Sequence, residues 1–262
     1  MTFSRALLGA VLGIAVLTLP AVAAANDRHF TYTYETAVLP PGARELEVWT
    51  TWRAGRERYY SRFDHRLELE VGVAKNLMTS LYINFTGLTE EDDTGQRASE
   101  FEYEGVSNEW KLKLSDPVAD AVGFGLYGEV TAAPSEYEAE AKLLFDKRVG
   151  DVLIAMNLVG ESEWKVQKDE TETELAVTPV AGVSYIVNPS FSAGVEIQNE
   201  NVIEEGELEH SVLSAGPVIS YSTETWWTTL TFLPQITDFK KGGIDDEAHE
   251  RVQVRLLLSS HL

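Results

Sequence analysis

Charged side chains recur at every second position along several stretches of this sequence. Between residues 62 and 70, for example, Arg62, Asp64, Arg66, Glu68 and Glu70 alternate with less polar residues. In an extended chain, residues at this spacing lie on one face. Carboxylate and guanidinium groups arranged in this way could pair as salt bridges, or they could line an aqueous path and select ions by charge.

The same alternation elsewhere extends this charged face. A strand with charge on one side and hydrocarbon on the other separates two solvents, so we expect the charged side to face a lumen. The predicted lumen-lining residues are Glu45, Glu47, Arg62, Asp64, Arg66, Glu68, Glu70, Glu109, Lys111, Lys113, Glu136, Glu138, Glu140, Lys142, Arg251 and Arg255.

The strands that carry these residues follow from alternation bounded by turn residues. No segment after the N-terminus has 18 uncharged apolar residues, so a closed barrel is the remaining way to span a membrane. We therefore predict an all-β protein, a closed antiparallel transmembrane β-barrel of about 12 strands over 44–262, preceded by a periplasmic lead-in over 26–43. The expected strands are 44–54, 59–75, 77–88, 100–115, 121–133, 135–146, 151–164, 171–187, 190–199, 209–222, 225–237 and 249–262.

Residues 1–25 have the pattern of a signal peptide. Arg5 precedes an apolar run from Ala6 to Leu19, and a small-residue stretch follows Pro20. The run is shorter than the roughly 20 residues that a membrane helix needs. We therefore predict export through the Sec pathway.

The connections between the expected strands alternate in character. Short turns such as 75–76 and 188–189 alternate with mostly longer, acidic stretches near 89–99, 165–170, 200–208 and 238–248. Outer-membrane barrels combine short periplasmic turns with longer outer loops. Aromatic residues gather near strand ends, where Trp and Tyr anchor at lipid headgroups. The predicted interface aromatics are Trp52, Tyr59, Tyr60, Trp164, Trp226 and Trp227.

Composition restricts the partners. The formal net charge is −21, which argues against nucleic acid as a partner. Cysteine is absent, so neither disulfides nor thiolate metal sites contribute. We expect outer-membrane lipid, lipopolysaccharide and the barrel-assembly machinery as partners, and the sequence leaves the oligomeric state open.

Catalytic and metal-binding patterns are weak. His65 is the one histidine on a predicted lipid-facing side, and Ser80 and Asn84 lie on the opposite face of the next strand, so a nucleophile and a base are not brought together. The other histidines show no paired spacing. We predict no catalytic residue, no metal ligand and no cofactor, and hence no enzyme. Acidic runs at 90–95 and 245–247 lack the complete calcium-loop pattern and are interpreted as a solvated rim.

Two stretches carry a resemblance. Residues 251–262 resemble the C-terminal signal by which Gram-negative assembly machinery recognises outer-membrane barrels, although the last residue is Leu262 rather than Phe and Ser260 takes an apolar place. Residues 32–49 resemble the opening of an uncharacterised group of exported bacterial barrels. The resemblance implies the outer membrane of a Gram-negative bacterium.

Three functions remain open at this point. The first is a passive channel for small hydrophilic or cationic solutes. The second is a non-conducting structural or surface barrel with a salt-bridged lumen. The third is a soluble periplasmic β-protein that binds a ligand in its interior.

Overall fold

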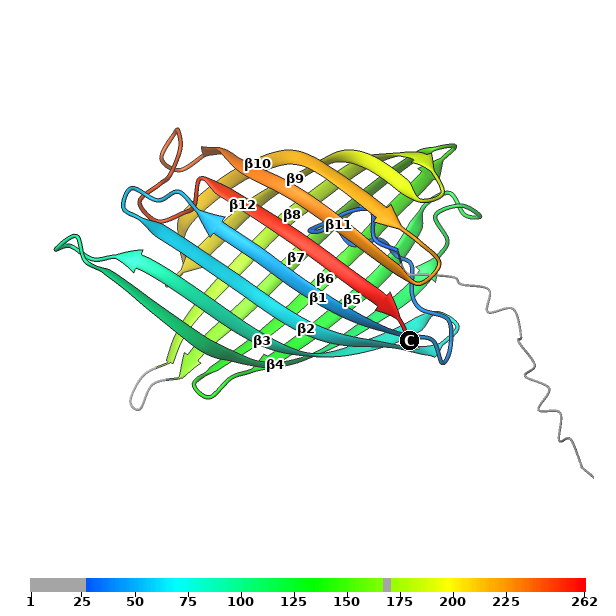
Figure 1. The fold of residues 1–262 in the computed structure, drawn as a ribbon, viewed down its shortest axis with the longest axis horizontal. Helices are drawn as coiled ribbons and strands as arrows, with labels where there is room; N and C mark the ends of the chain where they lie inside the picture. Colours follow the sequence, from blue (N-terminus) through cyan, green and yellow to red (C-terminus); the bar gives the residue numbers. More distant parts are fainter. Residues whose placement is uncertain (1–26, 167–170) are drawn as a thin grey trace, which may run out of the picture.

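The structure, a computed structural model, describes residues 27–166 and 171–262. In these ranges the chain forms strands joined by turns and loops (Figure 1). The strands are β1 (Arg44–Ala54), β2 (Tyr60–Ala74), β3 (Leu77–Glu91), β4 (Arg97–Ser115), β5 (Gly123–Ala132), β6 (Glu136–Val149), β7 (Val152–Val166), β8 (Thr171–Asn188), β9 (Phe191–Glu204), β10 (Glu207–Ser222), β11 (Trp226–Asp238) and β12 (Val252–His261).

Each strand pairs antiparallel with its neighbours in sequence, and β12 pairs with β1 to close the ring. The closing register runs without a break from Glu45 opposite His261 to Ala54 opposite Val252. Closure leaves no unpaired strand edge, which removes the template for aggregation that an open sheet presents. The predicted closed antiparallel barrel is confirmed, and the expected number of strands is correct.

Side chains alternate between the two faces along each strand. In β12, Leu256 and Leu258 are exposed on the outside, whereas Gln253, Leu257 and Ser259 are buried inside the ring. In β1, Leu46 and Val48 point outward and are also exposed. An apolar exterior around a polar interior is the arrangement of a barrel embedded in lipid.

The barrel has two ends that we name by their connections. The turn end carries the connections 75–76, 116–122, 150–151, 189–190 and 223–225 together with the C-terminus. The loop end carries 55–59, 92–96, 133–135, 205–206 and 239–251. The predicted long connections near 89–99 and 200–208 are shorter than expected, because β3, β4, β9 and β10 continue through most of them. The stretch 239–251 is a long loop.

The segment before β1 lies inside the barrel, a position that the sequence did not indicate. We predicted residues 26–43 as a lead-in, and its described part begins at Asp27. Phe30, Tyr34 and Leu39 of this segment are buried, and Figure 1 shows the segment in blue within the ring of strands. We call residues 27–43 the N-terminal segment. The predicted signal peptide, 1–25, lies outside the described residues.

Within the described ranges, the chain contains no helix of the length and apolarity needed to cross a membrane.

Two of the predicted interface aromatics point inward, and this part of the prediction is wrong. Trp227 is fully buried, and its indole Nε1 donates a hydrogen bond to Glu45 (3.1 Å). Tyr60 is also buried, beneath the guanidinium of Arg56. Neighbouring residues in a strand face opposite sides. In each of the pairs Tyr59–Tyr60 and Trp226–Trp227, only one ring can therefore face outward. Tyr59, Trp226 and Trp52 are exposed, and Trp164 is half-buried.

Replacing Leu256 by Arg tests the apolar exterior. The residue lies in the middle of β12 and faces outward, so the Leu256→Arg variant places a charge in hydrocarbon and should lower the free energy of unfolding by about 2 to 4 kcal/mol. Urea unfolding in lipid vesicles, followed by Trp fluorescence, measures the loss. Val118→Arg, in the exposed 116–122 connection, is the matched control and should change little. Equal losses in both variants would contradict the membrane-facing assignment.

Candidate functional site

The candidate functional site is a polar cavity of about 480 Å³ inside the barrel. Charged side chains from many strands line it, and Tyr32 and Tyr34 of the N-terminal segment border it. Acidic groups outnumber basic groups on its surface. The acidic lining residues are Asp64, Glu104, Glu129, Glu136, Glu138, Glu140, Glu161, Glu163 and Glu200, and the basic ones are Arg53, Arg62, Arg66, Lys142 and Arg255.

Four arginines gather on one wall, formed by the adjacent strands β12, β1 and β2. Asp64 lies between Arg53 and Arg62, with nitrogen–oxygen distances of 2.8 and 2.6 Å. Arg255 donates a hydrogen bond to Thr51 (2.8 Å). Arg66, the fourth arginine, stacks on the ring of Tyr82. Hydrogen bonds and aromatic contacts hold these guanidinium groups in place, which is the role that Arg serves better than Lys. We call these four residues the arginine wall.

Carboxylates gather on β5, β6 and β7. Glu140 stands opposite Glu129 on one side and Glu161 on the other, and Glu138 stands opposite Glu163. Like charges directly opposite each other across paired strands are destabilising. Their basic neighbours are few: Lys142 pairs with Glu140 (2.7 Å), Lys165 with Glu163 (2.7 Å) and Arg66 with Glu129 (3.6 Å). No described basic residue forms an ion pair with Glu138 or Glu161. We call Glu129, Glu136, Glu138, Glu140, Glu161 and Glu163 the glutamate wall.

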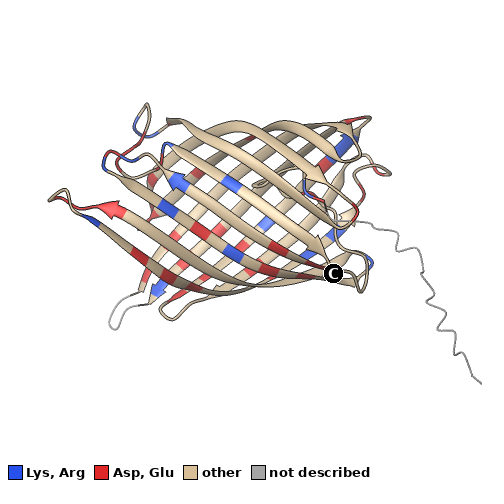
Figure 2. Ribbon diagram, viewed as in Figure 1, with Lys and Arg blue, Asp and Glu red and all other residues tan. Residues whose placement is uncertain are grey.

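The two walls face each other. In the closed ring of strands, β12 lies six positions from β6, and β1 lies six positions from β7, which places these strands on opposite sides. Figure 2 shows acidic and basic positions distributed along the strands of the barrel, and β2 carries both signs in alternation. Where the two walls face each other, the separation produces a field across the cavity. A solute crossing the cavity meets guanidinium groups on one side and, on the other, carboxyl groups of which Glu138 and Glu161 have no described ion-pair partner.

The N-terminal segment closes the turn end of the cavity, and Glu196 of β9 is its main anchor. One carboxylate oxygen accepts from the backbone N–H groups of Tyr32 (2.9 Å) and Thr33 (2.8 Å). The other accepts from the N–H of Thr31 (3.0 Å) and from the hydroxyl of Thr231 (2.5 Å). Backbone donors that converge on a carboxylate form strong, charge-assisted bonds. The segment is therefore bound at specific points.

Two further polar side chains bind the segment farther along. Asn157 of β7 accepts from the N–H of Tyr34 (2.6 Å) and donates to its carbonyl (2.9 Å). Asp146 of β6 accepts from the N–H (2.9 Å) and the hydroxyl (2.8 Å) of Thr36. An extended segment inside a lumen needs such partners, because its backbone has no neighbouring strand.

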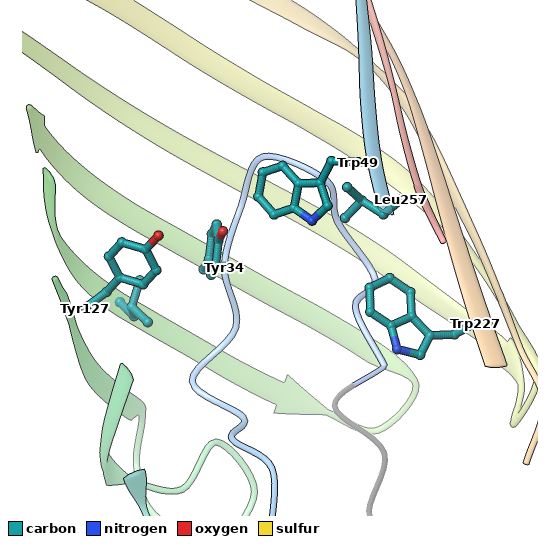
Figure 3. Packing of buried hydrophobic residues seen from close by; sticks show 6 residues of the cluster. Tyr34, Trp49, Tyr127, Trp227 and Leu257 are labelled. Atoms are coloured by element: carbon teal, nitrogen blue, oxygen red, sulfur yellow. The ribbon is translucent and has the colours of Figure 1, made fainter. Parts of the chain in front are cut away.

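Apolar contacts complete the closure. Phe30 packs in a cluster with Leu153 and Ala155 of β7 and Val218 of β10, which explains why the inward side of β7 is apolar. Gly182 leaves room for this ring, since an added Cβ would lie 2.5 Å from it. Tyr34 belongs to a second cluster, which includes Trp49 and Trp227 (Figure 3).

Arg28 is the most deeply placed cation of the segment. Its guanidinium lies 4.0 Å from the centre of the Tyr34 ring, and it approaches Glu47 at 3.9 Å. His29 pairs with Glu35 in the same segment, at 3.1 Å. Burial by itself lowers the pKa of His29, but the attraction and hydrogen bonding of Glu35 outweigh it and raise the pKa above its ordinary value.

The predicted lumen residues fall into three groups. Arg62, Asp64, Arg66, Glu136, Glu138, Glu140, Lys142 and Arg255 line the cavity. Glu45, Glu47, Glu68, Glu70, Glu109 and Lys111 are buried within the barrel. The remaining two lie elsewhere: Lys113 pairs with Asp116 of the turn end (2.7 Å), and Arg251 precedes β12, is exposed and contacts Asp246. The prediction for Arg251 is therefore wrong, because the strand begins after it.

Several site residues were missed. Glu129, Glu161 and Glu163 follow the period-two pattern and could have been found by extending it. The contacts of Glu196, Asp146 and Asn157 with the N-terminal segment have no signal in the sequence, because the partners lie more than 100 positions away. His65 stacks on outward-facing Phe63, and Ser80 is buried inside, so the two remain apart.

The closed ring, its apolar exterior and its charged interior place the fold in the class of outer-membrane β-barrel proteins. The chain belongs to a family of unknown function, DUF6662, whose model matches residues 22–258. No curated protein matches the sequence.

Solved structures share the fold at low sequence identity. The COG4313 outer membrane channel from Pseudomonas putida F1 superposes with a TM-score of 0.67 and 13% identity, over 87% of this chain and 98% of that chain. The KdgM porin, solved in complex with disordered oligogalacturonate, gives 0.53 and 9% identity over 82% and 98%. The NanC porin gives 0.51 and 14% over 83% and 100%. At these identities the likeness concerns the fold.

The anchoring role of Glu196 is testable by Glu196→Gln. The amide would present an NH₂ group to backbone donors that now meet a carboxylate oxygen, so the N-terminal segment should loosen. Amide hydrogen exchange at residues 31–33 should become roughly 10- to 100-fold faster, the equivalent of one lost charge-assisted bond. Glu161→Gln, on the glutamate wall, is the control and should leave these amides protected. Unchanged protection in Glu196→Gln would refute the anchor.

Proposed function

We propose that this protein is a channel in the outer membrane of a Gram-negative bacterium, for small hydrophilic solutes with a preference for cations, and that the N-terminal segment holds it closed. The observation that carries the proposal is the cavity between the arginine and glutamate walls. Short connections and both termini of such barrels lie in the periplasm, so we place the turn end there and the loop end outside.

The charge of the cavity supports a preference for cations. Its acidic groups outnumber its basic groups, and Glu138 and Glu161 have no described ion-pair partner. Rings or walls of unneutralised carboxylates attract cations into a pore. The arginine wall gives the opposite side a positive surface, so a solute carrying both charges would be oriented as it passes. No arrangement for covalent chemistry was predicted, and channels and porins share the fold.

The N-terminal segment favours one rival, a non-conducting barrel with a structural or surface role. The segment fills the turn end of the lumen and is held by Glu196, Asn157 and Asp146. If it never leaves, the cavity is a closed pocket. Export through the Sec pathway and insertion by the barrel-assembly machinery, among lipid and lipopolysaccharide, belong to both proposals.

Displacing the segment distinguishes the two. A Leu side chain at Gly182 would occupy the place of the Phe30 ring, so Gly182→Leu should raise the single-channel current of refolded protein in planar bilayers several-fold above that of the wild type. The matched control is Gly160→Leu on β7, where an added Cβ meets open space. If Gly182→Leu exposes the segment to protease and still passes no current, the barrel is not a channel.

Charge selectivity tests the glutamate wall. In the conducting form, and in an alkaline buffer that keeps both carboxyl groups ionised, Glu138→Gln combined with Glu161→Gln should reduce the permeability ratio of K⁺ over Cl⁻, because two carboxylates without a described ion-pair partner leave the cavity. Reversal potentials in a salt gradient measure the ratio. The control, Glu100→Gln with Glu102→Gln, removes the same charge from an exposed part of β4. Equal effects of both pairs would place the selectivity outside the cavity.

A further inference from the structure

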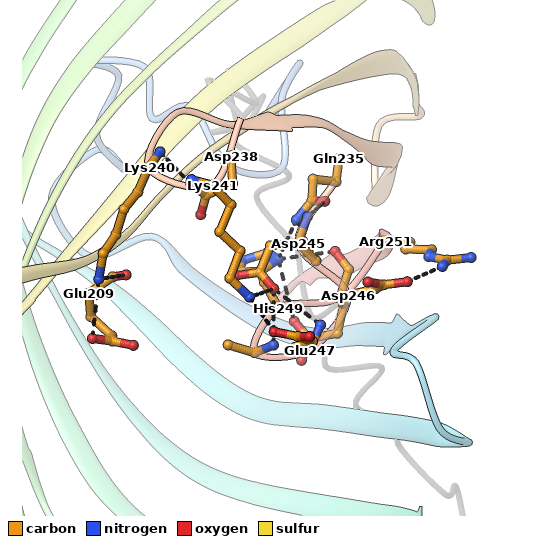
Figure 4. Close-up of polar contacts among 12 residues, drawn as sticks. Glu209, Gln235, Asp238, Lys240, Lys241, Asp245, Asp246, Glu247, His249 and Arg251 are labelled. Atoms are coloured by element: carbon orange, nitrogen blue, oxygen red, sulfur yellow. Dashed lines mark hydrogen bonds and ion pairs between the residues drawn. The ribbon is translucent and has the colours of Figure 1, made fainter. Parts of the chain in front are cut away.

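Loop 239–251 folds into a fixed structure at the loop end of the barrel. Asp238 accepts hydrogen bonds from the N–H groups of Lys240 (2.5 Å) and Lys241 (2.8 Å). Gln235 exchanges two bonds with the backbone of Asp245, at 3.0 and 2.7 Å. Figure 4 shows these contacts around the loop. The loop is therefore positioned well enough to present a side chain to the barrel wall.

That side chain is His249, which is buried against β9 and β10. Its Nε2 lies 3.3 Å from a carboxylate oxygen of Glu200, and its ring lies 5.5 Å from the ring of His210, at 72°. One potential ligand atom from each of these three residues lies within 4.8 Å of the others. Glu200 stands opposite Val212 in the register of β9 and β10, and His210 is two residues from Val212 on the same face, so the pairing of the strands brings both toward the loop.

One nitrogen of each imidazole is placed so that it can present a lone pair to this group. Nδ1 of His249 is 3.0 Å from the carbonyl of Glu250, to which it can donate. In the neutral ring that donates from Nδ1, Nε2 presents a lone pair toward the carboxylate of Glu200. Nε2 of His210 is buried without a hydrogen-bond partner among the described residues. A buried polar atom of this kind calls for a ligand, an ion or water.

A shared proton does not account for all three groups. A proton on Nε2 of His249 would satisfy Glu200, but it would leave Nε2 of His210 without a partner. A metal ion accepts lone pairs from both imidazoles and from the carboxylate together. The bond from Nδ1 of His249 to a backbone carbonyl is also the outer contact that orients a metal-bound histidine.

We propose that Glu200, His210 and His249 form a binding site for a divalent transition-metal ion of the Zn²⁺ type. Two imidazole nitrogens and one carboxylate oxygen suit zinc, whereas calcium and magnesium prefer oxygen ligands alone. In a tetrahedral zinc site the ligand atoms lie about 3.4 Å apart, given bonds near 2.1 Å. The 3.3 Å between Nε2 of His249 and the Glu200 oxygen already matches this separation, and the ligand atom of His210 lies within 4.8 Å of both.

The site joins the outer loop to the lumen. Glu200 also lines the cavity, so a bound ion would link loop 239–251, β9 and β10 beside the outer opening. The fourth coordination position would remain for water or another ligand, as in zinc sites with three protein ligands. The site is independent of whether the barrel conducts.

Isothermal titration of the full-length refolded protein in detergent with ZnCl₂, after removal of metal by chelation, tests the proposal. We expect one ion per chain. Loss of a residue that only hydrogen-bonds to a metal ligand weakens metal binding roughly 10- to 100-fold. His210→Gln and Glu200→Gln each remove a ligand itself, so each should weaken zinc binding by at least this factor. His65→Gln, on the outward side of β2, is the matched control and should bind as the wild type. Heat-modifiable mobility on gels verifies that each variant has folded.

A second measurement identifies the ligands directly. Co²⁺ in place of Zn²⁺ should give the visible absorption of a tetrahedral site with nitrogen ligands, and the His249→Gln variant should lose it. Absence of saturable zinc binding by the wild type would overturn the proposal. Equal binding by His210→Gln and the wild type would overturn it too, because the ion would then be held by acidic surface groups.

Discussion

The constraint on which this structure depends is that every backbone polar group facing lipid must have a hydrogen-bond partner within the protein. The ring of strands meets it through the unbroken pairing of β1 with β12, which removes both edges of the sheet. Once the ring is closed, the period-two alternation of the chain has a physical meaning. Apolar residues such as Leu256 face the outside, and polar residues such as Gln253 are confined to a small interior.

Confinement explains the chemistry of the interior. Charged groups that cannot reach bulk water need ion-pair or hydrogen-bond partners. In the lumen, some of these groups have such partners and others do not. The arginine wall is held by Asp64, Thr51 and aromatic rings, whereas parts of the glutamate wall lack a described basic partner. At the turn end, carboxylates instead bind backbone donors of the N-terminal segment, with Glu196 as the clearest case. Carboxylates therefore line the cavity in one part of the lumen, and at the turn end they bind the N-terminal segment that fills it.

At both ends of the lumen, a segment outside the strands contacts the inner wall of the barrel. The N-terminal segment occupies the turn end, while loop 239–251 lies at the loop end and brings His249 to Glu200. In each case one side of the contact is a side chain on a strand, and the other side belongs to the N-terminal segment or to loop 239–251. Segments of this kind can be displaced without breaking the ring, which makes them the natural places for control.

The sequence by itself determined the barrel, its strand number and most inward positions, because alternation and turn residues are local signals. It also contained the reason why Trp227 and Tyr60 face inward, since adjacent residues cannot share a face. Only the tertiary structure decided that the segment before β1 enters the lumen, that the arginine wall faces the glutamate wall, and that His210 meets His249. These contacts join residues far apart in the chain, and they exist because closure of the ring determines which strands stand opposite each other.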